Sequence, residues 1–406
     1  MSVLALLVAF TILLVIWAPV AVALGGSVLI AATFFSPVPL AIFGQKIYAN
    51  LDSFTLVAVP FFFLAAAFME SGGIVRHLVN LANMMVGRFR GGLGITTVLA
   101  CMFFATISGS SPATVAAVGG VMMPALVKAG YPKSYAVGAI TTAGGLGILI
   151  PPSIPLILYG FVTETSIPKL FIAGILPGLL YGGLLMLVAR LLAGRFTAVP
   201  MPALSRPERN AAIRNALPAL SLPLFLVVGI YGFPAFSIGS FHTRGGAIFT
   251  PTEASIVCAF AAILIGRYVY RELTLAKLLA TITETLPRVG MVFWIITNAI
   301  LFGFFLTQEG VPNALASWLV SIGMPQWGFL LAVNVLLVIA GLFLDGVPMI
   351  LLFMPVLFPA TKALGVDPIN FGIMVVVNIE LGLITPPVGL NLFVAGTISG
   401  MPVGQV

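Results

Sequence analysis

The sequence predicts an all-α polytopic membrane protein built from two inverted-topology repeats, each with a re-entrant helical hairpin and a broken transmembrane helix. Three observations lead to this prediction: the composition, the recurrence of apolar runs, and a pattern of Gly and Pro that occurs twice. Of the 406 residues, 60% are hydrophobic and only 7% are charged, whereas soluble domains carry about 25% charged residues. Lipid must therefore replace water around most of the surface.

Apolar runs long enough to cross a bilayer, which takes about 20 helical residues, recur along the whole chain. They lie at 2–17, 19–36, 55–72, 93–127, 135–161, 170–194, 216–233, 247–266, 289–307, 327–360 and 371–398. The first run lacks the basic region of a cleaved signal peptide. We therefore expect it to stay in the membrane as the first helix.

These runs divide the chain into two repeats, 1–194 and 216–406, joined by a polar linker at 195–215 that we expect to be cytoplasmic. The first repeat has scaffold helices in 1–92, a hairpin at 93–127, a broken helix at 131–161 and a helix at 170–194. The second has scaffold helices in 216–307, a hairpin at 327–360 and a broken helix at 371–398.

The orientation follows from three basic segments, because short basic loops of membrane proteins face the cytoplasm. The segments are Arg76 to Arg90, Arg195 to Arg214, and Arg267 to Arg288. All three lie on one side only if the runs 93–127 and 327–360 each return to the side that they entered. We therefore interpret both runs as hairpins that do not cross; a continuous helix with a Pro or Gly kink is the alternative.

Both hairpin runs contain a polar interruption, Ser108 to Thr114 in the first and Asp345 to Pro348 in the second. Each is followed by the same Gly and Pro positions at an offset of 235 residues. The first set is Pro124, Gly130, Leu146-Gly147 and Pro151-Pro152, and the second is Pro359, Gly365, Leu381-Gly382 and Pro386-Pro387. Because Gly and Pro dictate backbone geometry, the shared positions indicate a repeat. An inverted repeat with broken helices is typical of a secondary transporter.

The interruptions offer ligands for a cation and an anion together. Breaks in a helix free backbone carbonyls, which with hydroxyls such as Ser108, Ser111 and Thr385 suit Na⁺. Half-helix N-termini carry partial positive charge and suit a carboxylate. The serines could instead bond only to the local backbone.

Few ionisable residues lie inside the apolar runs, where charges are usually functional. Asp345 stands at the second tip, either near a sodium site or as a helix N-cap. Glu380 adjoins the break at Gly382, as a functional group or as a structural carboxylate. We place Glu70 and Glu284 at the membrane interface.

Several activities lack support in the sequence. It contains no phosphate-loop motif, no metal-ligand spacing and no Ser/His/Asp set, so we expect no enzymatic activity and no cofactor. The excess of 18 Lys and Arg over 11 Asp and Glu lies in the basic loops and does not indicate nucleic-acid binding. We expect Cys101 and Cys258 to be separate buried side chains, and His77 and His242 to be solvated loop residues.

Six segments resemble the large permease (DctM-like) subunit of tripartite ATP-independent periplasmic (TRAP) transporters. They are PFFFLAAAFMESGGI (60–74), ATISGSSPATVAAVG (105–119), GGLGILIPPSI (144–154), IFTPTEAS (248–255), LDGVPMILLFMPVLFP (344–359) and ELGLITPPVGLNLFV (380–394). The resemblance covers nearly all of the chain. It implies uptake of an organic acid, such as a C4-dicarboxylate or a sialic acid, across the bacterial inner membrane by sodium symport.

The resemblance also implies an elevator mechanism, in which a transport domain with both hairpins slides against a static scaffold. The implied partners are a small four-helix membrane subunit and a periplasmic substrate-binding protein. The implied sodium-binding region is Ser108, Ser110, Ser111, Gly145, Pro151, Gly346, Gly382, Thr385 and Pro386. The implied substrate-binding residues, between the two tips, are Ser110, Thr114, Asp345, Pro348 and Asn391.

The sequence departs from the family in two places. Family members usually continue with one more transmembrane helix beyond the position of Val406, which suggests that the chain is part of a longer one. Residues Phe233 to Gly245 resemble an insertion on the outer face, either a contact for the binding protein or a tolerated surface loop.

Two other functions are the alternatives. A stand-alone sodium–dicarboxylate symporter would need no binding protein. A channel would need a continuous polar pore lining, whereas here the polar groups gather at two tips and two breaks.

Overall fold

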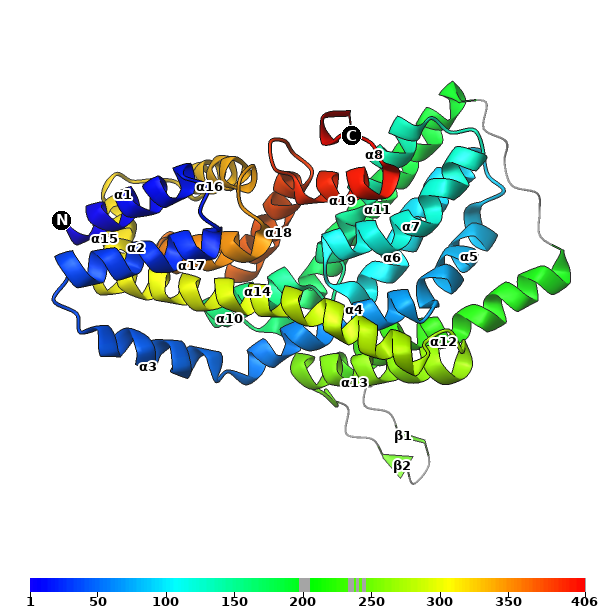
Figure 1. Ribbon diagram of the computed structural model, residues 1–406, viewed down its shortest axis with the longest axis horizontal. Helices are drawn as coiled ribbons and strands as arrows, with labels where there is room; N and C mark the ends of the chain where they lie inside the picture. The colour runs from blue at the N-terminus through cyan, green and yellow to red at the C-terminus, as the bar shows by residue number, and fades with distance from the viewer. Residues whose placement is uncertain (197–204, 233–236, 239–240, 243–245, 406) are drawn as a thin grey trace. The chain divides into compact units, whose positions relative to one another are not determined.

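The computed structural model describes residues 1–196, 205–232, 237–238, 241–242 and 246–405 (Figure 1). Almost every described element is a helix, which confirms the predicted all-α class. The exception is a short antiparallel pair, β1 (Ser237–Ile238) and β2 (Phe241–His242), in which Ser237 lies opposite His242. The rest of the predicted insertion at 233–245 lies outside the described residues.

The chain forms two compact units, and each draws on segments that are far apart in the sequence. Unit 1 comprises Met1–Leu56, Pro155–Leu170 and Leu286–Val388. Unit 2 comprises Val57–Ile154, Phe171–Thr285 and Gly389–Val406.

Unit 1 contains seven complete α-helices among its described residues. They are α1 (Ser2–Val15), α2 (Val20–Phe35), α3 (Leu40–Leu51), α15 (Val311–Ser321), α16 (Gln326–Gly341), α17 (Gly346–Ala363) and α18 (Pro368–Leu383). It also contains most of α10 (Ile154–Thr163) and the second part of α14 (Leu275–Gln308). Within the unit, α1 packs on α2, and α17 packs on α15 and α18.

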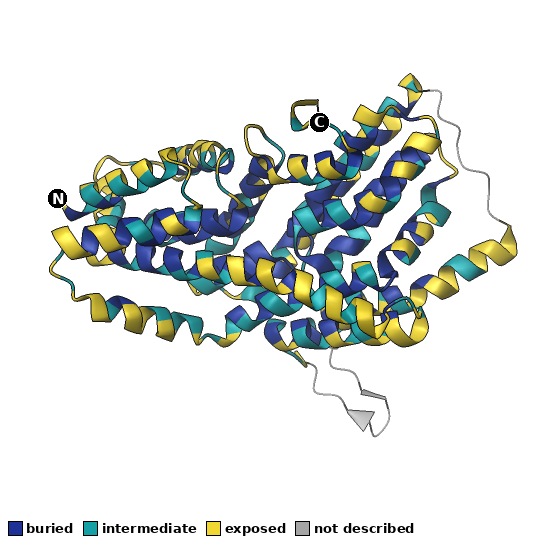
Figure 2. Ribbon diagram, viewed as in Figure 1, coloured by how far each residue is buried: buried dark blue, intermediate teal, exposed yellow. Residues whose placement is uncertain are grey.

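Unit 2 contains the first hairpin and the helices around it. Its helices are α4 (Ala58–Ser71), α5 (Ile74–Val86), α6 (Gly92–Ser108), α7 (Ser111–Lys128), α8 (Lys133–Gly144), α9 (Leu146–Leu149), most of α11 (Ile167–Leu192), α12 (Arg206–Tyr231), α13 (Pro251–Leu264) and α19 (Leu390–Ser399). Short turns of helix complete it: η2 (Ala193–Arg195), the π-helical η3 (Ile265–Val269) and η4 (Val403–Gln405), with η1 (Phe54–Val57) at the boundary. Helix α6 is buried along most of its length (Figure 2).

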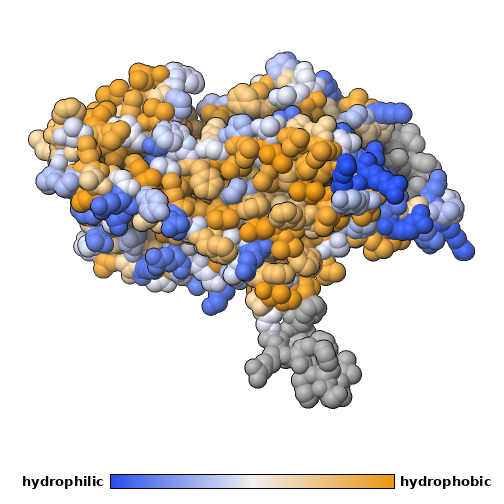
Figure 3. Space-filling view, turned by 60° about the horizontal axis from the view of Figure 1, so that its bottom comes forward, coloured by the Kyte–Doolittle hydropathy of each residue, from blue (hydrophilic) through white to orange (hydrophobic). Residues whose placement is uncertain are grey.

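Eight helices of the described chain are long and apolar enough to cross a membrane. Their exposed faces carry many apolar side chains; on α11, Leu176 is 75% exposed and Leu180 is 63% exposed. Apolar side chains also cover much of the face in Figure 3. A soluble protein rarely exposes so much contiguous apolar surface, so these faces fit a lipid environment.

Helix starts follow local capping signals. Ser205 and Glu208 form a capping box at the start of α12, and Thr250 and Glu253 form another at the start of α13. The carboxylate of Asp367 accepts from the first amides of α18. Each of these caps satisfies backbone donors that a helix end leaves open.

The two hairpin segments share one register. Helices α7 and α17 begin at Ser111 and Gly346 and end at Lys128 and Ala363, an offset of 235 residues at both ends. Helices α8 and α18 begin at Lys133 and Pro368, with the same offset. The Pro151-Pro152 and Pro386-Pro387 bonds are both cis.

The ends of α7 and α17 also match in hydrogen bonding. After α7, the amides of Gly130 and Tyr131 donate to Val127 and Leu126, with Gly130 at φ 91°. The equivalent bonds follow α17, where Gly365 has φ 70°. This is the Schellman arrangement, which needs a left-handed residue and favours Gly. The same backbone therefore recurs at the predicted offset; the inverted orientation of the halves stays a prediction.

Helix α12 corrects the boundary of the predicted linker at 195–215. It begins at Arg206, ten residues before the apolar run at 216–233, because the Ser205 capping box starts a helix in polar sequence. Residues 197–204 of that linker lie outside the described part of the chain. Helices α3, α5 and α15 were also not predicted as separate elements, since their apolar residues are interrupted by polar ones.

One buried phenol links two elements of unit 1. Tyr159 on α10 is fully buried, and its hydroxyl donates to the carbonyl of Pro368 at 2.6 Å. We expect Tyr159→Phe to destabilise the protein by about 1–2 kcal/mol, because a hydrogen bond is lost at a desolvated site. A thermal unfolding curve of the purified protein measures this, with Tyr268→Phe, 69% exposed, as the control. Equal melting temperatures for the two variants would contradict the expectation.

Candidate functional site

The first tip joins α6 to α7 through two residues. Gly109 has φ 61°, a left-handed conformation that most side chains disfavour. Ser110 is the N-cap of α7, and its hydroxyl accepts weakly from the amide of Ala113 at 3.5 Å. Helices α6 and α7 pack on each other, so the sequence 93–127 forms a helical hairpin.

Three hydroxyl groups and a backbone carbonyl gather under this tip. Ser108, Ser111 and Thr114 are fully buried. The hydroxyl of Thr114 donates to the carbonyl of Ser110 at 2.8 Å and lies 2.8 Å from that of Ser108. Since Thr114 has a single proton, Ser108 is then the donor to Thr114. We name Ser108, Ser110, Ser111 and Thr114 the hydroxyl cluster.

The hydroxyl cluster meets a residue from the other end of the chain. The side-chain amide of Asn391, in the first turn of α19, donates to the hydroxyl of Ser111 at 2.7 Å. Both side chains are fully buried, and α19 packs on α7 and α8 within unit 2. The half-helix after the second break is thus bonded to the first tip.

The first break packs tightly against the same tip. A Cβ on Gly147 would stand 2.5 Å from the Ser110 carbonyl oxygen and closer still to the hydroxyl of Thr114. The carbonyl of Gly109 accepts from the amide of Ile154 at 3.0 Å. Gly145 separates α8 from α9, and the half-buried Pro151 follows in the break. The hydroxyl cluster therefore lies against broken backbone.

The second tip and break, in unit 1, are chemically different. Asp345 takes the N-cap position of α17 but is exposed and makes no capping hydrogen bond with its side chain. Gly346 and Pro348 are buried in the first turn of α17. Asp345 thus occupies the N-cap position that was one of its two expected roles, while its functional role stays a prediction.

The second break rests on a close contact between two glycines. A Cβ on Gly382 would stand 2.7 Å from the Cα of Gly341. Across the break, the amide of Val388 donates to the carbonyl of Leu342 at 3.2 Å. The half-buried Thr385 donates its hydroxyl to the carbonyl of Leu381, next to the exposed Pro386.

The structure thus distributes the predicted site residues over two groups. Unit 2 holds Ser108, Ser110, Ser111, Thr114, Gly145, Pro151 and Asn391. Unit 1 holds Asp345, Gly346, Pro348, Gly382, Thr385 and Pro386. The sequence prediction separated Ser111 and Asn391 into sodium and substrate groups, whereas the two side chains bond directly to each other. The prediction also missed Gly341, which contacts Gly382. Its position four residues before the tip at Asp345 could have indicated it.

Other predicted residues have clear environments. Cys101 and Cys258 are free and buried, as expected. Glu380 is buried beside the second break. The prediction for His77 was wrong, because His77 lies in α5 and stacks on Tyr270 with 4.1 Å between ring centroids. Among the described residues, no group of three His, Cys, Asp or Glu could hold a metal ion.

Comparisons with known proteins agree over most of the chain. The family described as "Tripartite ATP-independent periplasmic transporter, DctM component" matches residues 7–406. The chain is 45% identical over 381 residues to the C4-dicarboxylate TRAP transporter large permease protein DctM of Pseudomonas aeruginosa, covering 94% of this chain and 86% of that protein. It is 33% identical to the sialic acid TRAP transporter large permease protein SiaM of Vibrio cholerae, covering 88% and 81%.

A solved transporter has a similar fold. The YdaH transporter of Alcanivorax borkumensis aligns with a TM-score of 0.61 at 15% identity, over 90% of this chain and 83% of that one. Identity this low supports the fold alone. The family match and the identities to the permeases show more: the chain belongs to the DctM family, the large permease components of TRAP transporters in the bacterial inner membrane.

Proposed function

We propose that this permease takes up a C4-dicarboxylate by sodium symport, using an elevator mechanism and receiving its substrate from a periplasmic binding protein. The choice of substrate class rests on the 45% identity to a C4-dicarboxylate permease across 94% of the chain. A small membrane subunit is the proposed second partner, as the name of the family, a component of a tripartite transporter, implies.

Sodium coupling is supported above all by the hydroxyl cluster. Buried hydroxyl and carbonyl oxygens next to a broken helix are the ligands that transporters offer to Na⁺. Ser108, Ser111 and the Ser110 carbonyl supply such oxygens without a formal charge, at a position closed to solvent. A monovalent cation would then be held by dipoles, which favours reversible binding.

A carboxylate fits the other half of this arrangement. The first turn of α19 begins at the second break and carries the positive end of the helix dipole, which suits an anion. The amide of Asn391 adds a donor in the same turn. Cation and anion would share α7 and α19, and their binding would be coupled through the bond between Ser111 and Asn391.

The elevator mechanism requires two bodies that hold their own shape. The chain forms two compact units, each with its own helix packing. The family resemblance assigns both hairpins to the moving body, whereas the first hairpin packs within unit 2 and the second within unit 1. Which body moves therefore stays a prediction.

The uptake experiment tests the proposal directly. Proteoliposomes would contain this permease and its small subunit, with binding protein and labelled succinate outside. We expect an inward sodium gradient to raise initial uptake at least about tenfold over the same liposomes with choline, because sodium binding is a step of transport. The controls are liposomes without binding protein and liposomes with a potassium gradient.

Two outcomes would change the proposal. Equal uptake with sodium and with choline would remove sodium coupling. Sodium-driven uptake without binding protein would favour a stand-alone sodium–dicarboxylate symporter, the second candidate function.

A further inference from the structure

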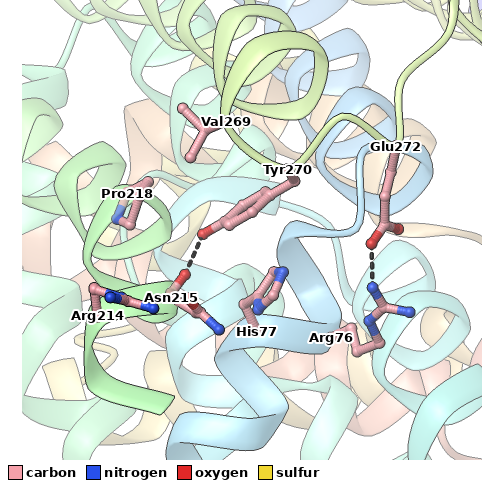
Figure 4. Close-up of a pocket in the computed structure, with 8 residues that line it drawn as sticks. All are labelled: Arg76, His77, Arg214, Asn215, Pro218, Val269, Tyr270 and Glu272. Carbon is pink, nitrogen blue, oxygen red and sulfur yellow. Dashed lines mark hydrogen bonds and ion pairs between the residues drawn. The ribbon is translucent and has the colours of Figure 1, made fainter. Parts of the chain in front are cut away.

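A cationic pocket of unit 2 lies apart from the tips and breaks. Its volume is about 530 Å³, and it is lined by Arg76, His77, Arg214, Asn215, Pro218, Val269, Tyr270 and Glu272 (Figure 4). These residues come from the start of α5, the third and fourth turns of α12, the end of η3 and the segment that follows it. Each of the three basic segments from which the sequence predicts the cytoplasmic side supplies at least one of these residues.

Three contacts hold these segments together. Arg76 forms an ion pair with Glu272. The hydroxyl of Tyr270 donates to the carbonyl of Asn215 at 2.6 Å, and the ring of His77 stacks on Tyr270. All three segments therefore contribute to one pocket, which fits their predicted location on a single side of the membrane.

The pocket contains more positive than negative side chains. Glu272 neutralises Arg76, while the guanidinium of Arg214 makes no hydrogen bond or ion pair with any residue that the structure describes. Burial and the charge of Arg76 hold the pKa of His77 below its usual value, against the opposing effect of Glu272. Helix α5 is too short, at 13 residues, to cross a bilayer. The pocket therefore carries an excess positive charge at the predicted interface.

The surroundings of the pocket are apolar. Val269, which lines it, is 54% exposed, and Leu217, one turn after Arg214 on α12, is 57% exposed. The neighbouring Tyr268 is 69% exposed. A cationic site with exposed apolar side chains beside it matches a ligand that has an anionic head and an apolar tail.

We propose that this pocket binds the phosphate of an anionic phospholipid from the cytoplasmic leaflet, with Arg214 as the principal contact. A guanidinium presents a planar pair of donors that matches two phosphate oxygens. Basic pockets between membrane helices on the cytoplasmic side recognise anionic head groups. The acyl chains would lie along Leu217 and Val269, and the bound lipid would join the third and fourth turns of α12 to the start of α5.

The test uses the full chain, purified in detergent and titrated with phosphatidylglycerol or phosphatidylcholine. Native mass spectrometry measures bound lipid, and thermal unfolding measures the stabilisation that lipid gives. We expect Arg214→Gln to raise the apparent Kd for phosphatidylglycerol about fivefold and to leave phosphatidylcholine unchanged, since one interfacial Arg contributes about that factor. Arg209→Gln is the matched control, because Arg209 is an exposed arginine of α12 outside the pocket.

A second variant separates ligand binding from damage to the fold. Glu272→Gln removes the carboxylate that competes for Arg76, so we expect it to lower the apparent Kd for phosphatidylglycerol. An unchanged preference for phosphatidylglycerol in Arg214→Gln would overturn the proposal, as would weaker binding in Glu272→Gln. Inorganic phosphate is titrated in parallel, and we expect it not to displace the lipid at equal concentration. Displacement by phosphate would overturn the assignment to a lipid.

Discussion

Gly147→Val should abolish uptake. The added Cβ alone would collide with the Ser110 carbonyl oxygen, 2.5 Å away, and with the hydroxyl of Thr114. The carbonyl belongs to the backbone and cannot rotate away, so either the first break or the first tip must shift. Overpacking of this kind costs about 1–3 kcal/mol or more. We expect initial uptake in proteoliposomes to fall at least about a hundredfold, because the displaced groups belong to the proposed sodium site.

Gly138→Val on α8 is the matched control. No atom lies within 4 Å of a Cβ added at Gly138, so the same change in residue type meets open space there. Its uptake should stay within about twofold of the unsubstituted protein, and both variants should be inserted at equal levels. Uptake by Gly147→Val at the level of this control would show that the contact has no role in transport.

Ser111→Ala should weaken sodium activation strongly. The substitution removes a proposed ligand and leaves the buried amide of Asn391 without its acceptor on Ser111. Because one direct oxygen ligand and one buried hydrogen bond are lost, at about 1–3 kcal/mol, we expect the sodium concentration for half-maximal uptake to rise about tenfold or more. The measurement is uptake as a function of sodium at a fixed succinate concentration.

Two further variants are compared with Ser111→Ala in the same experiment. Ser27→Ala is the control, because Ser27 is a buried serine of α2 whose hydroxyl bonds only to the local carbonyl of Leu24. Thr385→Ala should have a smaller effect than Ser111→Ala, since Thr385 is only half-buried. Sodium activation that is equal in Ser111→Ala and Ser27→Ala would rule out Ser111 as a ligand.

Much of the fold could be predicted because helices that face lipid give long apolar runs in the sequence, and because glycines mark the positions where the chain reverses. The long apolar runs correspond to helices such as α1, α2 and α11, whose ends lie within a few residues of the predicted ones. Gly130 and Gly365 have the left-handed backbone that a chain reversal after a helix needs. Helices α3, α5 and α15 were not predicted, because they are short and amphipathic. A search for apolar runs does not detect a helix with one polar face.

The site was predictable in its residue types and not in its pairings. Three serines within four residues of an apolar run pointed to the first tip, and the structure buries Ser108 and Ser111 there. The bond between Ser111 and Asn391, 280 residues apart, depends on how α19 packs against α7, which no local pattern encodes. The pocket around Arg214 was missed for a similar reason: sequence assigns its charges to loops, and only packing brings the loops together.

Because the two hairpins share one register, each side chain at the first tip can be compared with the side chain at the equivalent position of the second tip. The positions 235 residues after Ser108, Ser111 and Thr114 in the first hairpin are Phe343, Gly346 and Met349 in the second. Such a pairing is what duplication of an ancestral gene leaves when the turns are constrained and the side chains between them are free to diverge. The difference between the proposed sodium site at the first tip and the apolar side chains at the second therefore lies in a few side chains, on a backbone register that both copies share.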